Sequence, residues 1–180
     1  MSTSTENLHG TEKAGRFELE ARLTDLGISF TTHTHDPVFT VAESDDLHRL
    51  IPGAHTKNLF LKDAKARLFL VVAHHETPVA LKQLHKRLGA ARFSFGKAEL
   101  LKEVLGVEPG SVTAFAAMND LENKVTVVVD SELQKSEIIN AHPLQNDATT
   151  SVAYTDLLVF LSAHSHDPII SDLTENAPRP

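Results

Sequence analysis

A β-strand is predicted for the stretch Lys57-Asn58-Leu59-Phe60-Leu61-Lys62-Asp63. Side chains alternate between the faces of a strand, so Lys57 shares one face with two leucines, and Lys62 shares the other with Phe60. Each face therefore carries both a lysine and large apolar side chains, whereas a purely structural strand usually has charged residues on one face and apolar residues on the other. Either the Lys57-Asn58 pair has a chemical role, or the strand begins in solvent with Lys57 exposed.

The residues around this strand predict its neighbours. Residues 63–66 are short and polar, as in a hairpin connection, and residues 67–73 are strongly apolar, so two antiparallel strands are expected. Upstream, Pro52-Gly53 turns the chain out of a helix predicted at 40–50. Thr40 is placed to cap that helix, with Glu43 completing a capping box.

Hydrophobic spacing and turn residues predict the other elements. Further helices are expected at 15–26, 77–89 (starting at Thr77-Pro78), 97–105 and 155–164, and further strands at 28–34, 124–130, 137–141 and 149–154, with 112–117 extended. The sum is an α+β fold: a mixed, largely antiparallel sheet with surrounding helices. Residues 15–168 are predicted to form a single domain, flanked by flexible tails at 1–14 and 169–180.

Composition restricts the classes of function. A chain of 180 residues can bury one core, and the absence of cysteine excludes a cysteine nucleophile, a thiolate metal site and a disulfide framework. The first 15 residues lack the apolar segment of a signal peptide, and no apolar run approaches the ~20 residues of a membrane span. A cytoplasmic protein without a membrane partner is expected.

Eleven histidines raise the question of a metal site. His33 and His35 would share a strand face, but no carboxylate completes a ligand set, and there is no H-E-x-x-H motif. Neither a metal nor any other cofactor is predicted.

The charge is unevenly distributed. Residues 57–102 contain ten basic and three acidic residues, a net charge of +7, whereas the rest of the chain carries −14. This asymmetry favours a surface that faces a polyanion; the alternative is ordinary solvated helix faces.

Two loops have residues suited to a site. At Pro109-Gly110-Ser111, a glycine lets backbone amides approach a ligand oxygen, although a plain turn has the same requirement. At His142-Pro143, a histidine stands at a strand end, again open to a structural interpretation.

Several motifs together resemble the YbaK/EbsC and prolyl-tRNA-synthetase-associated editing family, most closely its stand-alone alanyl-tRNA(Pro) deacylases, called ProXp-ala or PrdX. They are Thr32-His33-Thr34-His35-Asp36-Pro37-Val38-Phe39-Thr40-Val41, His55-Thr56-Lys57-Asn58-Leu59-Phe60-Leu61-Lys62-Asp63, Gly106-Val107-Glu108-Pro109-Gly110-Ser111-Val112-Thr113, Asn119-Asp120, and His142-Pro143-Leu144 with Asn146, Thr149 and Thr150. The similarity covers nearly the whole chain except both tails.

This resemblance implies hydrolysis of the ester that joins a mischarged amino acid to tRNA. Lys57 resembles the family's invariant lysine, which is expected to hold the terminal adenosine or its phosphate and to fix the ester. Asn58 and His142 are expected to shape the site, and the backbone amides of the Gly110-Ser111 loop to face the carbonyl. The family's G-x-x-x-P loop ends here in Ala114 instead of proline.

The implied substrate is alanyl-tRNA(Pro), held by its acceptor end, with prolyl-tRNA synthetase as a second partner. A synthetase pocket built for proline admits alanine, since each missing methylene is worth only ~1–3 kcal/mol, so a second, smaller site must hydrolyse the product. Val38, Phe39 and Thr40 are candidates to line that pocket. Water is expected to be positioned by the backbone and by the substrate's ribose hydroxyl, with Lys57 orienting the ester.

The sequence leaves three alternatives open. The first is a deacylase with another substrate, either cysteinyl-tRNA(Pro) or a tRNA carrying a small non-protein amino acid. The second is a protein that binds aminoacyl-tRNA without turnover, and the third is a binding domain without an RNA role.

Overall fold

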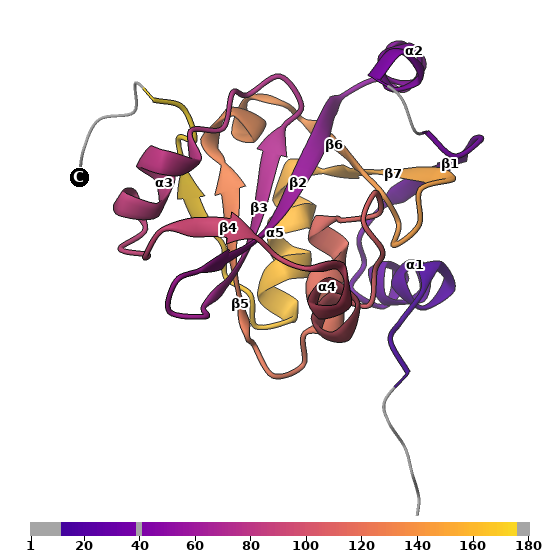
Figure 1. Cartoon of the computed structure of the whole chain (residues 1–180). Coiled ribbons are helices and arrows are strands. Elements are labelled where there is room, and N and C mark those ends of the chain that lie inside the picture. The colour runs from indigo at the N-terminus through magenta and orange to yellow at the C-terminus, as the bar shows by residue number, and fades with distance from the viewer. Residues whose placement is uncertain (1–11, 39–40, 176–180) are drawn as a thin grey trace, which may run out of the picture.

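The protein is described by a computed structural model that covers residues 12–38 and 41–175 (Figure 1). Its α-helices are α1 (Arg16–Asp25), α2 (Val41–Leu50), α3 (Leu81–Arg87), α4 (Ala98–Leu105) and α5 (Tyr154–Ala163), and its 3₁₀ helices are η1 (Ala114–Asn119) and η2 (Ser131–Lys135). Its strands are β1 (Phe30–Thr34), β2 (Ala54–Asp63), β3 (Leu68–His74), β4 (Phe93–Phe95), β5 (Val125–Asp130), β6 (Ile138–Ala141), β7 (Ala148–Ala153) and β8 (Ile169–Ser171). The predicted α+β class is confirmed.

Strand β2 joins two halves of one sheet. The strand order is β1-β7-β6-β2-β3-β5-β8, with β4 also paired to β2. The first residues of β2 pair in parallel with β6, whereas residues 56–62 pair antiparallel with β3 and residues 61–63 with β4. The pairs β1–β7 and β6–β7 are also antiparallel, and β3–β5 and β5–β8 are parallel. The mixed, largely antiparallel sheet is therefore confirmed, as is the predicted β2–β3 hairpin.

Both faces of β2 are buried at Phe60 and Leu61. Phe60 belongs to the larger core, together with Leu70 and Phe160, and Leu61 belongs to a smaller core, together with Phe69 and Leu84. Figure 1 shows α5 crossing behind the strands and α3 at the left edge of the sheet. The apolar residues on both faces of this stretch therefore reflect a sheet covered on both sides.

The hairpin end of β2 is fixed by Asp63, which is 3% exposed. Its carboxylate accepts hydrogen bonds from the amides of Lys65, Arg67 and Ala91, and from the Arg67 guanidinium at 2.8–2.9 Å. Burial raises the pKa of Asp63, but the hydrogen bonds, with that from Ala91 the largest, lower it from 3.8 to about 2. These hydrogen bonds thus stabilise the buried negative charge of Asp63.

Helix α2 lies at the opposite end of β2, apart from the body of the domain (Figure 1). None of its side chains described at 43–50 is buried, and Leu50 is 79% exposed. The helix is followed by Ile51, which is 4% exposed, and by Gly53, whose φ of +112° favours glycine. Few buried contacts therefore hold α2 in place. The Thr40 cap predicted for this helix lies outside the described residues.

Two predicted segments are corrected. Of residues 112–117, predicted to be extended, Thr113 is extended but 114–117 belong to η1, because the Thr113 side chain accepts a hydrogen bond from the amide of Phe115 and caps this helix. The helix predicted from Thr77 begins at Leu81, because the Thr77 hydroxyl donates to buried Asp130 and cannot cap the helix. The helix predicted at 155–164 starts one residue earlier, at Tyr154 after Ala153.

Both predicted tails are shorter than expected. Strand β8 pairs in parallel with β5, and Leu173 is fully buried in the smaller core, so residues 169–173 belong to the domain. At the other end, the Lys13 ammonium donates to the carbonyls of Val104 and Asn119. No helix in the described ranges is both long and apolar enough to cross a membrane.

Candidate functional site

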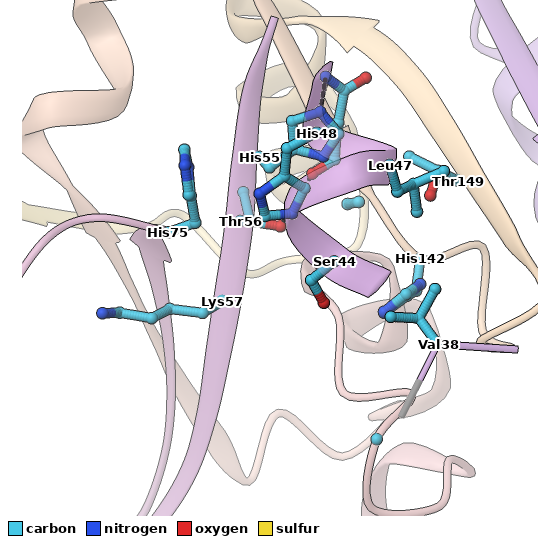
Figure 2. A pocket seen from close by; sticks show the side chains of 13 residues that line it. Val38, Ser44, Leu47, His48, His55, Thr56, Lys57, His75, His142 and Thr149 are labelled. Carbon is cyan, nitrogen blue, oxygen red and sulfur yellow. Dashed lines mark hydrogen bonds between the residues drawn. The ribbon is translucent and has the colours of Figure 1, made fainter. Parts of the chain in front are cut away.

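A pocket of about 350 Å³ lies where β2 leaves β6 and turns into the other half of the sheet. Its walls come from α2, β2, the ends of β6 and β7, and the loop before η1 (Figure 2). The lining residues are Val38, Ser44, Leu47, His48, His55, Thr56, Lys57, His75, Gly110, Asn140, Ala141, His142 and Thr149. The pocket is thus mostly polar and has one fixed charge, that of Lys57.

Lys57 is half-buried in the middle of β2, opposite Ala73 of β3. Among the residues that the structure describes, its ammonium has neither a hydrogen-bond partner nor an ion-pair partner. Figure 2 shows the side chain extended, with the amine directed away from His142 and Val38. Lys57 and His142 can therefore contact different parts of an elongated ligand.

His142 has a defined tautomer. Its Nδ1 lies 3.2 Å from the carbonyl oxygen of Ala148, which can only accept, so in the neutral ring Nδ1 carries the proton and Nε2 keeps the lone pair. Burial lowers the pKa of His142, although the Ala148 carbonyl opposes the shift. Next to it, the His35 ring and the Thr149 hydroxyl are hydrogen-bonded at 2.9 Å. The ring of His142 is thus a neutral acceptor at the wall of the pocket.

A stack of histidines forms another wall of the pocket. The rings of His48 and His55 are stacked with centroids 4.0 Å apart, and His75 meets His48 edge-on at 4.6 Å. Burial, followed by the nearby His55 and His75, lowers the pKa of His48 to about 4, and burial also lowers the pKa of His55. The lowered pKa values favour the neutral form of His48 and His55 at pH 7, and the stack joins α2 to β2 and to the end of β3.

Two ring nitrogens in this stack lack a partner. Within the described ranges, Nδ1 of His48 and Nδ1 of His75 are buried without any hydrogen bond. By contrast, His55 Nε2 is hydrogen-bonded to the carbonyl of Ile51 at 2.8 Å. Unpartnered polar atoms beside a cavity are positions where a ligand can supply the missing hydrogen bond.

Four of the predicted site residues lie on the pocket wall: Val38, Lys57, Gly110 and His142. Gly110 has a φ of +93°, and a Cβ placed there would meet no atom within 4 Å, so the glycine serves the backbone conformation. Phe39 and Thr40 lie outside the described residues.

Two predicted site residues are not on the wall. The amide of Ser111 donates to the carbonyl of Glu108 at 3.0 Å, so this amide is used within the turn and does not face a substrate carbonyl. Asn58 lies behind Thr56, 3.4 Å from its hydroxyl, while Thr56 itself donates to the carbonyl of Asn140. Asn58 thus contacts a residue of the pocket wall, and its Oδ1 is buried without a hydrogen-bond partner within the described ranges.

The histidine stack was not predicted from the sequence. Its members come from three segments of the chain: α2, β2 and the turn after β3. The hairpin register brings them together, because the amide of His75 donates to the carbonyl of His55. Aligning the two predicted strands would have been enough to place this pair side by side. In the described part of the chain, no group of three or more His, Asp or Glu could hold a metal ion.

Comparisons with known proteins identify the family. The family model described as aminoacyl-tRNA editing domain matches residues 35–160. A zebrafish (Danio rerio) protein named prolyl-tRNA synthetase associated domain-containing protein 1 is 43% identical over 157 residues, which cover 86% of this chain and 85% of that protein. The prolyl-tRNA editing protein ProX of Acetoanaerobium sticklandii is 35% identical over 147 residues, covering 81% of this chain and 90% of that protein.

A solved structure agrees with the fold. A crystal structure described as a candidate trans-editing enzyme for prolyl tRNA synthetase superposes with a TM-score of 0.69 over 89% of this chain and 97% of that one, at 15% identity. At that identity the likeness concerns the fold alone. The family model and the two relatives confirm the resemblance drawn from the motifs and the prediction of an aminoacyl-tRNA deacylase. The chain belongs to the aminoacyl-tRNA editing domain family.

Proposed function

We propose that this protein hydrolyses the ester of alanyl-tRNA(Pro), bound by its acceptor end, and so removes alanine that prolyl-tRNA synthetase has misattached. The observation that carries the proposal is the Lys57 ammonium, which stands without a partner among the described residues on a pocket of about 350 Å³. A buried or half-buried cation without an internal partner is suited to an anionic ligand. The acceptor end of a tRNA brings such a group, its terminal phosphate.

The two ends of the pocket suit the two ends of the substrate. Lys57 is placed for the terminal adenosine or its phosphate, while Val38, His142 and Thr149 enclose the other end (Figure 2). Small and β-branched side chains there leave room for alanine and restrict proline. The relative named prolyl-tRNA editing protein ProX supports a tRNA(Pro) substrate.

Hydrolysis requires a water molecule that is positioned near the ester and loses a proton during its attack. Water adds to the ester carbonyl carbon, the bond from that carbon to the ribose oxygen breaks, and the ribose oxygen takes a proton as the free amino acid leaves. Nε2 of His142 is available to accept a hydrogen bond from the water or from the neighbouring ribose hydroxyl. Lys57 orients the ester electrostatically, and no covalent intermediate is required.

The test is a time course of ester loss from alanyl-, prolyl- and cysteinyl-tRNA(Pro), with the wild type and Lys57→Ala in parallel. Selective loss of alanine that disappears in the variant is expected. Loss of cysteine instead of alanine would change the substrate and keep the site. Tight tRNA binding without loss of any amino acid would indicate a binding module and overturn the proposal, as would full activity of Lys57→Ala.

A further inference from the structure

Strand β4 carries an exposed aromatic ring between basic side chains. Phe95 is 65% exposed, and it borders a cavity of about 600 Å³ that Lys62, Lys97 and Leu100 also line. Arg92 is exposed just before the strand. A large exposed aromatic side chain next to several cations is typical of surfaces that stack on nucleobases and contact phosphates.

The cations around Phe95 are not used in ion pairs. Within 12–38 and 41–175, neither Lys62, Arg92 nor Lys97 has an ion-pair partner, whereas Lys102, Lys124 and Lys135 each form an ion pair with a nearby glutamate at 2.6–2.7 Å. Glu99 and Glu103 on α4 line the same cavity, and Asp63 is already bound by Arg67. The charges of Lys62, Arg92 and Lys97 are therefore available to an anionic partner.

The position of Phe95 relative to the pocket follows from strand register. Phe95 lies opposite Leu61 on β4, and β4 pairs with the edge of β2 that β3 does not occupy, while the Leu61 side chain itself is buried in the smaller core. Four residues separate Lys57 from Leu61, about 13 Å along the strand. Stacked nucleotides advance by ~3.4 Å each, so the few unpaired nucleotides at the 3′ end of a tRNA span a comparable distance.

We propose that Phe95, together with Lys62, Arg92 and Lys97, is the docking surface for the end of the tRNA acceptor stem. This inference rests on the proposed function. With the terminal adenosine at Lys57, the 3′ end follows β2 toward β4, where the Phe95 ring stacks on the first base beyond the unpaired end. The three cations contact the adjoining phosphates, which position the RNA without reading its sequence.

The test compares a long and a short substrate. Phe95→Ala is expected to lower kcat/KM for alanyl-tRNA(Pro) by about 5- to 100-fold, the range expected for one lost base–aromatic stack. It should leave hydrolysis of alanyl-adenosine unchanged, because that ester is too short to reach β4. Phe95→Trp, which keeps a ring, should restore activity on tRNA. The matched control is Phe17→Ala on α1, since Phe17 is 80% exposed and should matter for neither substrate.

The outcomes separate this inference from the proposed function. Hydrolysis of both esters by the wild type, with Phe95→Ala equally active on tRNA, would overturn the docking surface and leave the activity intact. An equal loss on both substrates would also overturn it, since the variant would then be acting on the pocket. If the wild type hydrolysed neither ester, binding of an uncharged acceptor-stem hairpin would decide: weaker binding by Phe95→Ala supports the surface, and unchanged binding overturns it.

Discussion

The charged side chains at the two ends of β2 differ in their hydrogen-bond partners. At the hairpin end, the Asp63 carboxylate is buried and receives hydrogen bonds from three backbone amides and one guanidinium. At the pocket end, the Lys57 ammonium has no such partner among the described residues, and two imidazole nitrogens beside it are also unpartnered. A charge that is fully compensated stabilises the fold, whereas an uncompensated one is available to a ligand. The same strand therefore has a structural end and a functional end.

The largest effect that would separate the two ends is expected for Lys57→Met. It removes the cation and keeps much of the side-chain volume, so Tm should change little. Loss of one electrostatic contact to the reacting group typically costs 10²–10³ in rate, and kcat/KM for alanyl-tRNA(Pro) should fall by about that factor. Thermal melts and deacylation assays measure both quantities. A large fall in Tm with activity retained would mean that Lys57 has a structural role and not a functional one.

The reciprocal variant is Asp63→Asn, which leaves donors at the hairpin without a carboxylate. Tm should fall more than in Lys57→Met, and activity of the folded protein at 25 °C should stay near that of the wild type. Because the pKa of Asp63 is lowered from 3.8 to about 2, its contribution to stability is present above pH 4 and is lost as pH falls toward 2. Unfolding by denaturant at pH 6 and at pH 3 should show a smaller loss in the variant than in the wild type.

The smallest effect is expected from the histidine stack. The folded protein disfavours protonation of His48, whose pKa is lowered from 6.5 to about 4, so the unfolded chain binds more protons in this interval. Stability should therefore be fully present above pH 6.5 and decline as pH falls toward 4. His48→Leu keeps an apolar contact and should flatten part of that decline in denaturant titrations. His33→Leu on β1 serves as the control, and an identical pH profile in His48→Leu and the wild type would contradict the prediction.

Local patterns were sufficient for most of the fold. Apolar spacing predicted α4, and apolar runs and turn residues predicted β2, β3 and β5. Long-range contacts decided the rest. Thr77 has the form of a helix cap but donates to Asp130, and residues 169–171 have no strand signal of their own until β5 offers them an edge.

The site divides in the same way. Motif order was enough to bring Lys57, Gly110 and His142 to one pocket. It could not show that the Ser111 amide donates its hydrogen bond to Glu108, because this depends on the conformation of the turn. Nor could it show that His48 on α2 stacks on His55, because this depends on how the helix packs against β2.

The short strand β8 has a consequence for association between chains. It pairs in parallel with residues 128–130 of β5 and ends the strand order of the sheet, while Leu173 belongs to the smaller core. If β8 detached, the apolar strand β5 would become an open edge, and an unpaired edge of this kind is where association with other chains begins. With β8 in place, the sheet ends in a strand of three residues, which offers another chain little backbone to pair with.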